Sequence, residues 1–202
     1  MSVPVVLASA SPRRRDLLAL LGLAFDVAPT DVDESWRDGE APEVHAERLA
    51  REKALAGRRE GAVTIGADTI VVLGDSVFGK PGDIAEACRM LRELSGRNHR
   101  VITGVCLIAG RSDDERSFAV ETAVRFRELS DTDIEGYLAA VNVFDKAGAY
   151  AIQEGPPLVA AIEGSYSNVV GLPLEQLAEE LRSLGVQIAE TGKIPATTPS
   201  GR

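Results

Sequence analysis

The segment LASASPRRRDLL, residues 7–18, predicts a buried strand followed directly by a helix. Residues 3–7 are apolar and β-branched, and Ser11-Pro12 is typical of a helix N-cap and first helical position. Three arginines, residues 13–15, therefore fall in the first turn, where free N–H groups and the helix dipole favour anions. Two interpretations stay open: arginines and helix end together bind an anion such as phosphate, or the arginines lie in solvent.

Strand and helix signals alternate along the rest of the chain. We expect helices over residues 42–59, 83–94 and 131–140, and a last one after SYSNVVGLPL (165–174). Strands are expected over residues 24–28, 62–73, 76–78, 100–109, 117–127, 150–153 and 158–162. Because hairpins join some strands and helices join others, the sequence predicts an α/β fold with a mixed, twisted sheet flanked by helices. Residues 1–188 are expected to form a single domain, of one or two lobes, and residues 189–202 a flexible tail.

Composition limits the classes of function. The chain has 202 residues, and its 22 Lys and Arg against 31 Asp and Glu give a net charge of −9. This acidic balance argues against a nucleic-acid partner, which would require a basic surface. Cys88 and Cys106 have no CxxC spacing and are expected to be free thiols. With no long apolar stretch and no signal-peptide profile, we expect a cytoplasmic protein without a membrane partner.

A carboxylate interrupts one apolar run. Asp68 lies in GADT (66–69), between Ile65 and Ile70, although Asp is disfavoured in strands and costly to bury unpaired. It is either a carboxylate at a strand end, which binds a divalent metal or takes a proton from water, or part of an exposed turn that Gly66 permits.

Other polar loops add cations and acids. FGKP holds Lys80 between Gly and Pro, and DKAGAYAIQ places Asp145 and Lys146 in a loop and Gln153 at the end of a strand. The candidate cations are Arg13, Arg14, Lys53, Lys80 and Lys146, and the candidate acids are Glu34, Asp68 and Asp145. Such a set suits a polyphosphate bound with a divalent metal. His45 is expected in solvent on a charged helix face, and His99 at the start of a strand.

Seven motifs within residues 4–184 resemble those of the Maf family. They are LASASPRR, AREKA, IGADTIV, GKP, LSGRNHRVITGV, DKAGAYAIQ and YSNVVGLPL. The resemblance implies a Maf/ITPase-like fold with an active-site cleft between two lobes. It also implies a nucleoside triphosphate pyrophosphatase that releases a monophosphate and pyrophosphate with a divalent cation, Mg²⁺ or Mn²⁺.

The resemblance also implies roles for individual residues. Asp68 corresponds to the family's proton acceptor and, with Glu34, to a metal ligand; Asp145 and Lys146 are additional candidates. The phosphate-binding positions fall on Ser9, Arg13, Arg14, Lys53 and Lys80. Arg13, Thr69 and Gln153 match three specificity positions of the branch that resembles dTTP and UTP pyrophosphatases, whereas the 7-methyl-GTP branch has Glu at the Gln153 position.

Alternatives remain within and outside the enzyme class. The chain could be a 7-methyl-GTP-type or broad-range nucleoside triphosphate pyrophosphatase, or a non-enzymatic regulator of septum formation. The sequence favours the enzyme, because a vestigial site should have lost some of its acids and cations, and all are present. The expected partner is the nucleoside triphosphate substrate, and a homodimer is left open.

Overall fold

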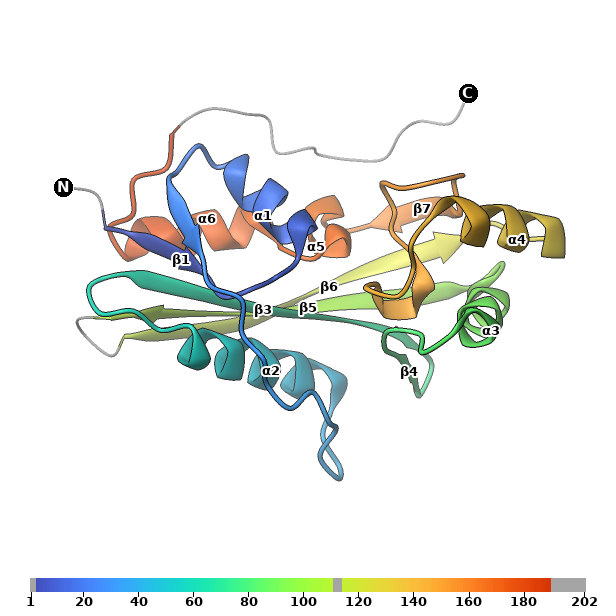
Figure 1. Ribbon diagram of the computed structural model, residues 1–202, viewed down its shortest axis with the longest axis horizontal. Helices are drawn as coiled ribbons and strands as arrows, with labels where there is room; N and C mark the ends of the chain where they lie inside the picture. Colours follow the sequence, from blue (N-terminus) through green and yellow to red (C-terminus); the bar gives the residue numbers. More distant parts are fainter. Residues whose placement is uncertain (1–2, 111–113, 190–202) are drawn as a thin grey trace.

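A twisted seven-stranded sheet forms the centre of the molecule (Figure 1). The computed structural model describes residues 3–110 and 114–189. The strands are β1 (Val5–Leu7), β2 (Phe25–Val27), β3 (Val63–Leu73), β4 (Ser76–Phe78), β5 (Asn98–Ala109), β6 (Glu115–Phe126) and β7 (Val159–Glu163). The helices are α1 (Pro12–Ala19), α2 (Pro42–Ala56), α3 (Ile84–Leu94), α4 (Asp131–Ala140), α5 (Tyr166–Val170) and α6 (Leu174–Ser183), with a 3₁₀ turn η1 at Ala147–Ala149.

The sheet is mixed, as predicted. Its order is β2-β1-β3-β5-β6-β7, and β4 pairs with β3. β1 runs parallel to β2 and β3, whereas the pairs β3–β4, β3–β5, β5–β6 and β6–β7 are antiparallel. The helix α1 supplies the crossover that parallel pairing of β1 and β2 requires, and the short turn between β3 and β4 forces antiparallel pairing.

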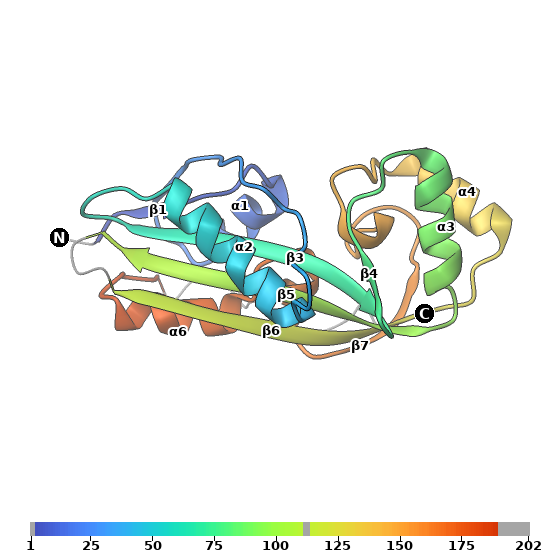
Figure 2. The ribbon, with the colours of Figure 1, turned by 90° about the horizontal axis from the view of Figure 1, so that it is seen from below.

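The two faces of the sheet carry different helices. Figure 1 shows α2 beneath the sheet and α1, α5 and α6 above it. Because side chains alternate along a strand, Ile65 and Ala67 of β3 join the core with α1 and α6, whereas Ile70 and Val72 pack with Ala46 of α2. Figure 2 shows α3 and α4 at the other end of the sheet from α6, where a second core surrounds Tyr137 and Phe126.

Two glycines bring α2 into close contact with the sheet. A Cβ on Gly66 of β3 would lie 2.0 Å from the carbonyl oxygen of Ala50, and one on Gly104 of β5 would lie 2.3 Å from that of Ala46. A side chain at either position would push the helix away from the sheet. Gly66 is therefore an interior strand residue, not part of an exposed turn.

The first helix begins as predicted. Pro12 occupies its first turn, and the Ser11 hydroxyl accepts a hydrogen bond from the Arg14 amide at 3.5 Å. Leu17 and Leu18 are buried beneath it. The next helix, α2, ends at Ala56, three residues earlier than expected, because Gly57 caps it.

The predicted strand over residues 150–153 is wrong. Gly148 and Ala149 both have positive φ, so the chain turns immediately before this segment. The Tyr137 hydroxyl then accepts from the Ala151 amide at 2.9 Å and lies 3.3 Å from the Ala151 carbonyl. A buried side chain thus satisfies peptide groups that a strand partner would otherwise bind. The expected tail falls mostly on residues 190–202, outside the described residues.

Both cysteines and one histidine follow the sequence prediction. Cys88 and Cys106 are free thiols. His99, near the start of β5, is buried, and its Nε2 lies 2.8 Å from the Tyr150 hydroxyl. Because burial disfavours the charged imidazolium, the pKa of His99 falls to about 4.

Candidate functional site

A pocket opens beside β3, between the segments where β1 and β4 pair with one edge of this strand. β1 pairs with Val63–Ile65 and β4 with Val71–Leu73, so within the described residues the pairing of 66–70 is with β5 on the opposite edge. The pocket has a volume of about 390 Å³ and is bordered by α1, α2, β3 and the loop before η1. Asp68 and Thr69, which point to opposite faces of the sheet, both reach it.

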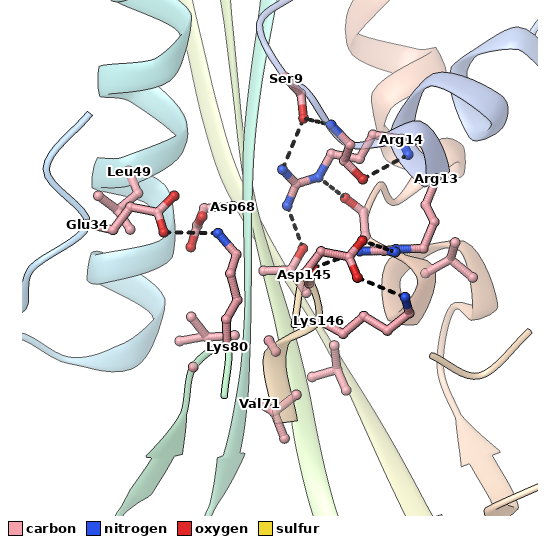
Figure 3. Close-up of a pocket in the computed structure, with 18 of the residues that line it drawn as sticks. Ser9, Arg13, Arg14, Glu34, Leu49, Asp68, Val71, Lys80, Asp145 and Lys146 are labelled. Atoms are coloured by element: carbon pink, nitrogen blue, oxygen red, sulfur yellow. Dashed lines mark hydrogen bonds and ion pairs between the residues drawn. The ribbon is translucent and has the colours of Figure 1, made fainter. Parts of the chain in front are cut away.

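The structure brings all the sequence-predicted site residues together. Every one of them lines this pocket: Ser9, Arg13, Arg14, Glu34, Lys53, Asp68, Thr69, Lys80, Asp145, Lys146 and Gln153. Among those labelled in Figure 3, Glu34, Asp68 and Lys80 lie on one side of β3, and Arg13, Arg14, Asp145 and Lys146 lie on the other.

Asp68 occupies the middle of β3, so the expectation of a strand end or an exposed turn is wrong. It is 8% exposed and faces α2, which supplies its partner. The Lys53 Nζ donates to Asp68 Oδ1 at 2.6 Å and to Glu34 Oε1 at 2.7 Å. The ammonium group compensates the cost of burying this carboxylate, which explains how Asp is tolerated in an interior strand.

Glu34 links two lysines from distant elements. Its second oxygen accepts from Lys80 Nζ at 3.2 Å. Burial alone would raise the pKa of Glu34, but hydrogen bonds and charge from Lys53 and Lys80 outweigh it and hold the pKa below its ordinary value. Glu34 is therefore ionised at neutral pH, and the pocket has two carboxylates that share one lysine.

The loop that carries Glu34 is anchored by residues that the sequence analysis misjudged. His45, expected in solvent, is 2% exposed; its Nδ1 lies 2.9 Å from Glu40 Oε2, and its ring stacks on Trp36 at 3.7 Å. Arg48 donates to both oxygens of Glu40, at 2.6 and 2.9 Å. A single tryptophan within an acidic loop was the available signal, because a large ring seldom remains without a packing partner.

On the opposite face, Arg14 is fixed by three hydrogen bonds. Its guanidinium donates to the Gly171 carbonyl at 2.9 Å, to Thr69 Oγ1 at 3.0 Å and to Ser9 Oγ at 3.4 Å. Burial lowers the pKa of Arg14 and the charge of Asp68 raises it, with a net decrease. Arginine remains protonated at neutral pH, so Arg14 is a fixed positive charge at the pocket wall.

The three arginines of the first helical turn are not equivalent. Arg13 Nη1 pairs with Asp145 Oδ2 at 2.7 Å, and Lys146 Nζ contacts the other oxygen of that carboxylate at 2.9 Å. Arg15 points away, with 57% of its side chain exposed, and contacts Asp16. Arg13 and Arg14 therefore fit the interpretation as an anion site, and Arg15 fits the interpretation as a surface residue.

The last cluster of charged side chains in the pocket lies around Asp145. Burial alone would raise the pKa of Asp145, but the hydrogen bonds and charges of Lys146 and Arg13 outweigh this effect and hold the pKa below its ordinary value. Glu154, which the sequence analysis missed, lies 3.2 Å from Lys146 Nζ and accepts from Gln153 Nε2 at 3.4 Å. Gln153 thus lies on a turn, not at a strand end, and still lines the pocket.

The described residues contain neither a ready-made cluster of metal ligands nor a membrane-spanning helix. There, no group of three or more His, Cys, Asp or Glu side chains could hold a metal ion. Within residues 3–110 and 114–189, no helix has the length and apolar character needed to cross a bilayer.

The fold resembles that of a solved HAM1 protein from Coxiella burnetii. The TM-score is 0.52 at 17% sequence identity, and the match covers 90% of this chain and 99% of the other. At this identity the likeness establishes the class of fold, a mixed α/β sheet flanked by helices, and confirms that prediction.

Sequence comparison identifies the family. Residues 4–184 match the Maf-like protein family, and the chain belongs to it. A relative from Geobacter sulfurreducens, called dTTP/UTP pyrophosphatase, is 52% identical over 184 residues, which cover 90% of this chain and 96% of the relative. A second with the same name, from Geotalea uraniireducens, is 50% identical over 184 residues, or 90% and 95% of the two chains.

Proposed function

We propose that the chain hydrolyses dTTP and UTP to the monophosphate and pyrophosphate, in the cytoplasm and without nucleic-acid or membrane partners. The observation that carries the proposal is the Lys53 ammonium held between Asp68 and Glu34 in a pocket that also holds Arg13, Arg14 and Lys80. Relatives that match nearly their whole length to this chain carry the name dTTP/UTP pyrophosphatase.

The cations would bind the triphosphate. Arg13, Arg14, Lys53, Lys80 and the Ser9 hydroxyl all reach the pocket, and each can donate to a phosphate oxygen. Several of them are paired with carboxylates in the free protein, so they are already oriented toward the pocket. The net charge of −9 makes this local concentration of cations necessary for binding a polyanion.

Asp68 and Glu34 fit a divalent cation such as Mg²⁺ or Mn²⁺. Their oxygens converge on one ammonium at 2.6 and 2.7 Å, which shows that both carboxylates can face a single positive charge. Two carboxylates, completed by water and phosphate oxygens, suit Mg²⁺, which seldom takes an all-protein ligand set. When bound, the metal would neutralise developing charge on the phosphates.

Asp68 would take the proton of the attacking water. The water oxygen bonds to the α-phosphorus, the α–β phosphoanhydride breaks, and pyrophosphate leaves with the electrons of that bond. Asp68 is a suitable acceptor because it is anchored in a strand and held in one position by Lys53.

Arg13, Thr69 and Gln153 would contact the base. The Gln153 amide can donate and accept at once, which suits the adjacent carbonyl and N–H groups of uracil and thymine. A carboxylate at that position would only accept and would favour the donor edge of guanine.

A pyrophosphate-release assay over ATP, GTP, CTP, UTP, dTTP and 7-methyl-GTP, with and without Mg²⁺, tests the proposal. UTP and dTTP should react fastest, with little effect of the 2′-hydroxyl. Asp68→Asn should lower the rate by on the order of 100-fold or more while the far-ultraviolet circular dichroism is unchanged. Equal rates on all nucleotides would favour a broad-range enzyme, and no release with any of them a regulator of septum formation.

A further inference from the structure

A line of three hydrogen bonds leads from the pocket into the core. Arg14 Nη2 donates to Thr69 Oγ1, Thr69 Oγ1 lies 3.0 Å from Thr103 Oγ1, and Thr103 Oγ1 donates to the Asn168 carbonyl at 3.0 Å. Thr69 and Thr103 are directly opposite each other on β3 and β5, which holds their hydroxyls together. Thr103 is fully buried, whereas Thr69 borders the pocket.

The direction of this line follows from the number of protons. A hydroxyl has one proton and two lone pairs. The carbonyl of Asn168 can only accept, so the Thr103 proton is committed to it. The Thr69–Thr103 bond then requires the Thr69 proton, because Thr103 has none left.

The carbonyl at the end of the line is fixed. The Asn168 side chain is buried and donates to the Val101 carbonyl at 3.1 Å and to Thr122 Oγ1 at 3.0 Å. The Gly171 amide also donates to the Asn168 carbonyl at 3.0 Å. The backbone oxygen therefore stays where Thr103 can reach it.

Thr69 is left with one unused lone pair. Its proton goes to Thr103, one lone pair receives Arg14, and within the described residues the other has no partner. The group that meets Thr69 in the pocket must consequently be a donor. The deprotonated oxygens of a triphosphate have no proton to give, whereas a base with a ring N–H does.

We infer that Thr103 is a positioning residue that makes Thr69 an obligate hydrogen-bond acceptor, so that Thr69 selects bases carrying a ring N–H. Uracil and thymine present an N–H at ring position 3, and cytosine presents a bare acceptor nitrogen there. Cytosine would face Thr69 with lone pair against lone pair. This inference rests on the proposed function and names a residue that sets its base preference.

Thr103→Val tests the inference, with Thr103→Ser as the matched control. Valine keeps the shape but removes the acceptor of the Thr69 proton, so Thr69 can turn that proton toward the pocket and donate to cytosine. The ratio of kcat/KM for UTP to that for CTP should fall by on the order of tenfold in Thr103→Val and stay within about twofold in Thr103→Ser.

Three results would overturn the inference. The first two are an unchanged ratio in Thr103→Val and an equal fall of the ratio in Thr103→Ser. The third is a loss of kcat/KM in Thr103→Val that depends on the ribose 3′-hydroxyl of the substrate and not on its base, because Thr69 would then accept from the sugar. Thermal unfolding of both variants separates a lost fold from lost selectivity.

A second measurement does not depend on the substrate. Neutron diffraction of deuterium-exchanged crystals locates the hydroxyl deuterons, and we expect Thr69 deuterated toward Thr103 and Thr103 toward Asn168. A Thr103 deuteron directed at Thr69 would overturn the inference even in an enzyme that prefers UTP. The expected deuterons in an enzyme that hydrolyses UTP and CTP equally would contradict the base selection by Thr69, whereas no pyrophosphate release from any nucleotide would contradict the proposed function.

Discussion

The ion pair between Lys53 and Asp68 should be required for stability as well as for activity. Each residue is 8% exposed, and their charged atoms lie 2.6 Å apart. Lys53→Met removes the ammonium but keeps most of the apolar stem. The variant leaves a carboxylate in the interior of β3 without the cation that compensates its burial.

Breaking a buried ion pair by removing one partner costs about 3–5 kcal/mol, mainly because the remaining charge is uncompensated. The two side chains border an open pocket, where water can reach the carboxylate, so we expect the lower end, about 3 kcal/mol. The double variant Lys53→Met/Asp68→Asn has no buried charge left at this position. It should therefore regain most of the lost stability while staying inactive.

Urea unfolding at pH 7, followed by circular dichroism, measures the free energy of unfolding of each variant. Arg15→Met is a matched control, because that exposed arginine should contribute less than about 0.5 kcal/mol. The reasoning fails if Lys53→Met costs less than about 1 kcal/mol, or if the double variant is no more stable than Lys53→Met.

Three more outcomes follow. Arg13→Ala and Arg14→Ala should each lower kcat/KM by on the order of tenfold or more and Arg15→Ala by less than about twofold; equal losses would indicate a general charge effect. The pKa of His99 in the folded protein, about 4, lies below its ordinary value of 6.5. The contribution of neutral His99 to the free energy of unfolding is therefore complete above pH 6.5 and declines as the pH falls toward 4. His99→Gln should remove about 3 kcal/mol of this pH dependence in urea unfolding, and an unchanged slope would contradict the assignment. Gln153→Glu should lower activity on UTP more than on 7-methyl-GTP, a ratio that competition assays measure directly.

Local sequence was sufficient wherever the interactions are local. Ser11 and Pro12 set the start of α1 through contacts within one turn, and the short turn between β3 and β4 fixes their antiparallel pairing. Asp68 was likewise visible in the sequence, because a carboxylate in an apolar run has few structural explanations, whereas the other cations and acids were singled out by the motifs that contain them.

What the sequence alone determined, then, was the alternation of elements, the family motifs and the set of polar residues that line the pocket. The tertiary structure decided where each side chain points and what it meets. Asp68 could be placed in the middle of a strand only once Gly66 had brought α2 close enough for Lys53 to reach it. His45 is buried because it pairs with Glu40, and residues 150–153 do not form a strand because the Tyr137 hydroxyl binds their backbone at Ala151. Burial and hydrogen-bond partners arise between residues distant in sequence, so no short segment contains the free-energy terms that select them.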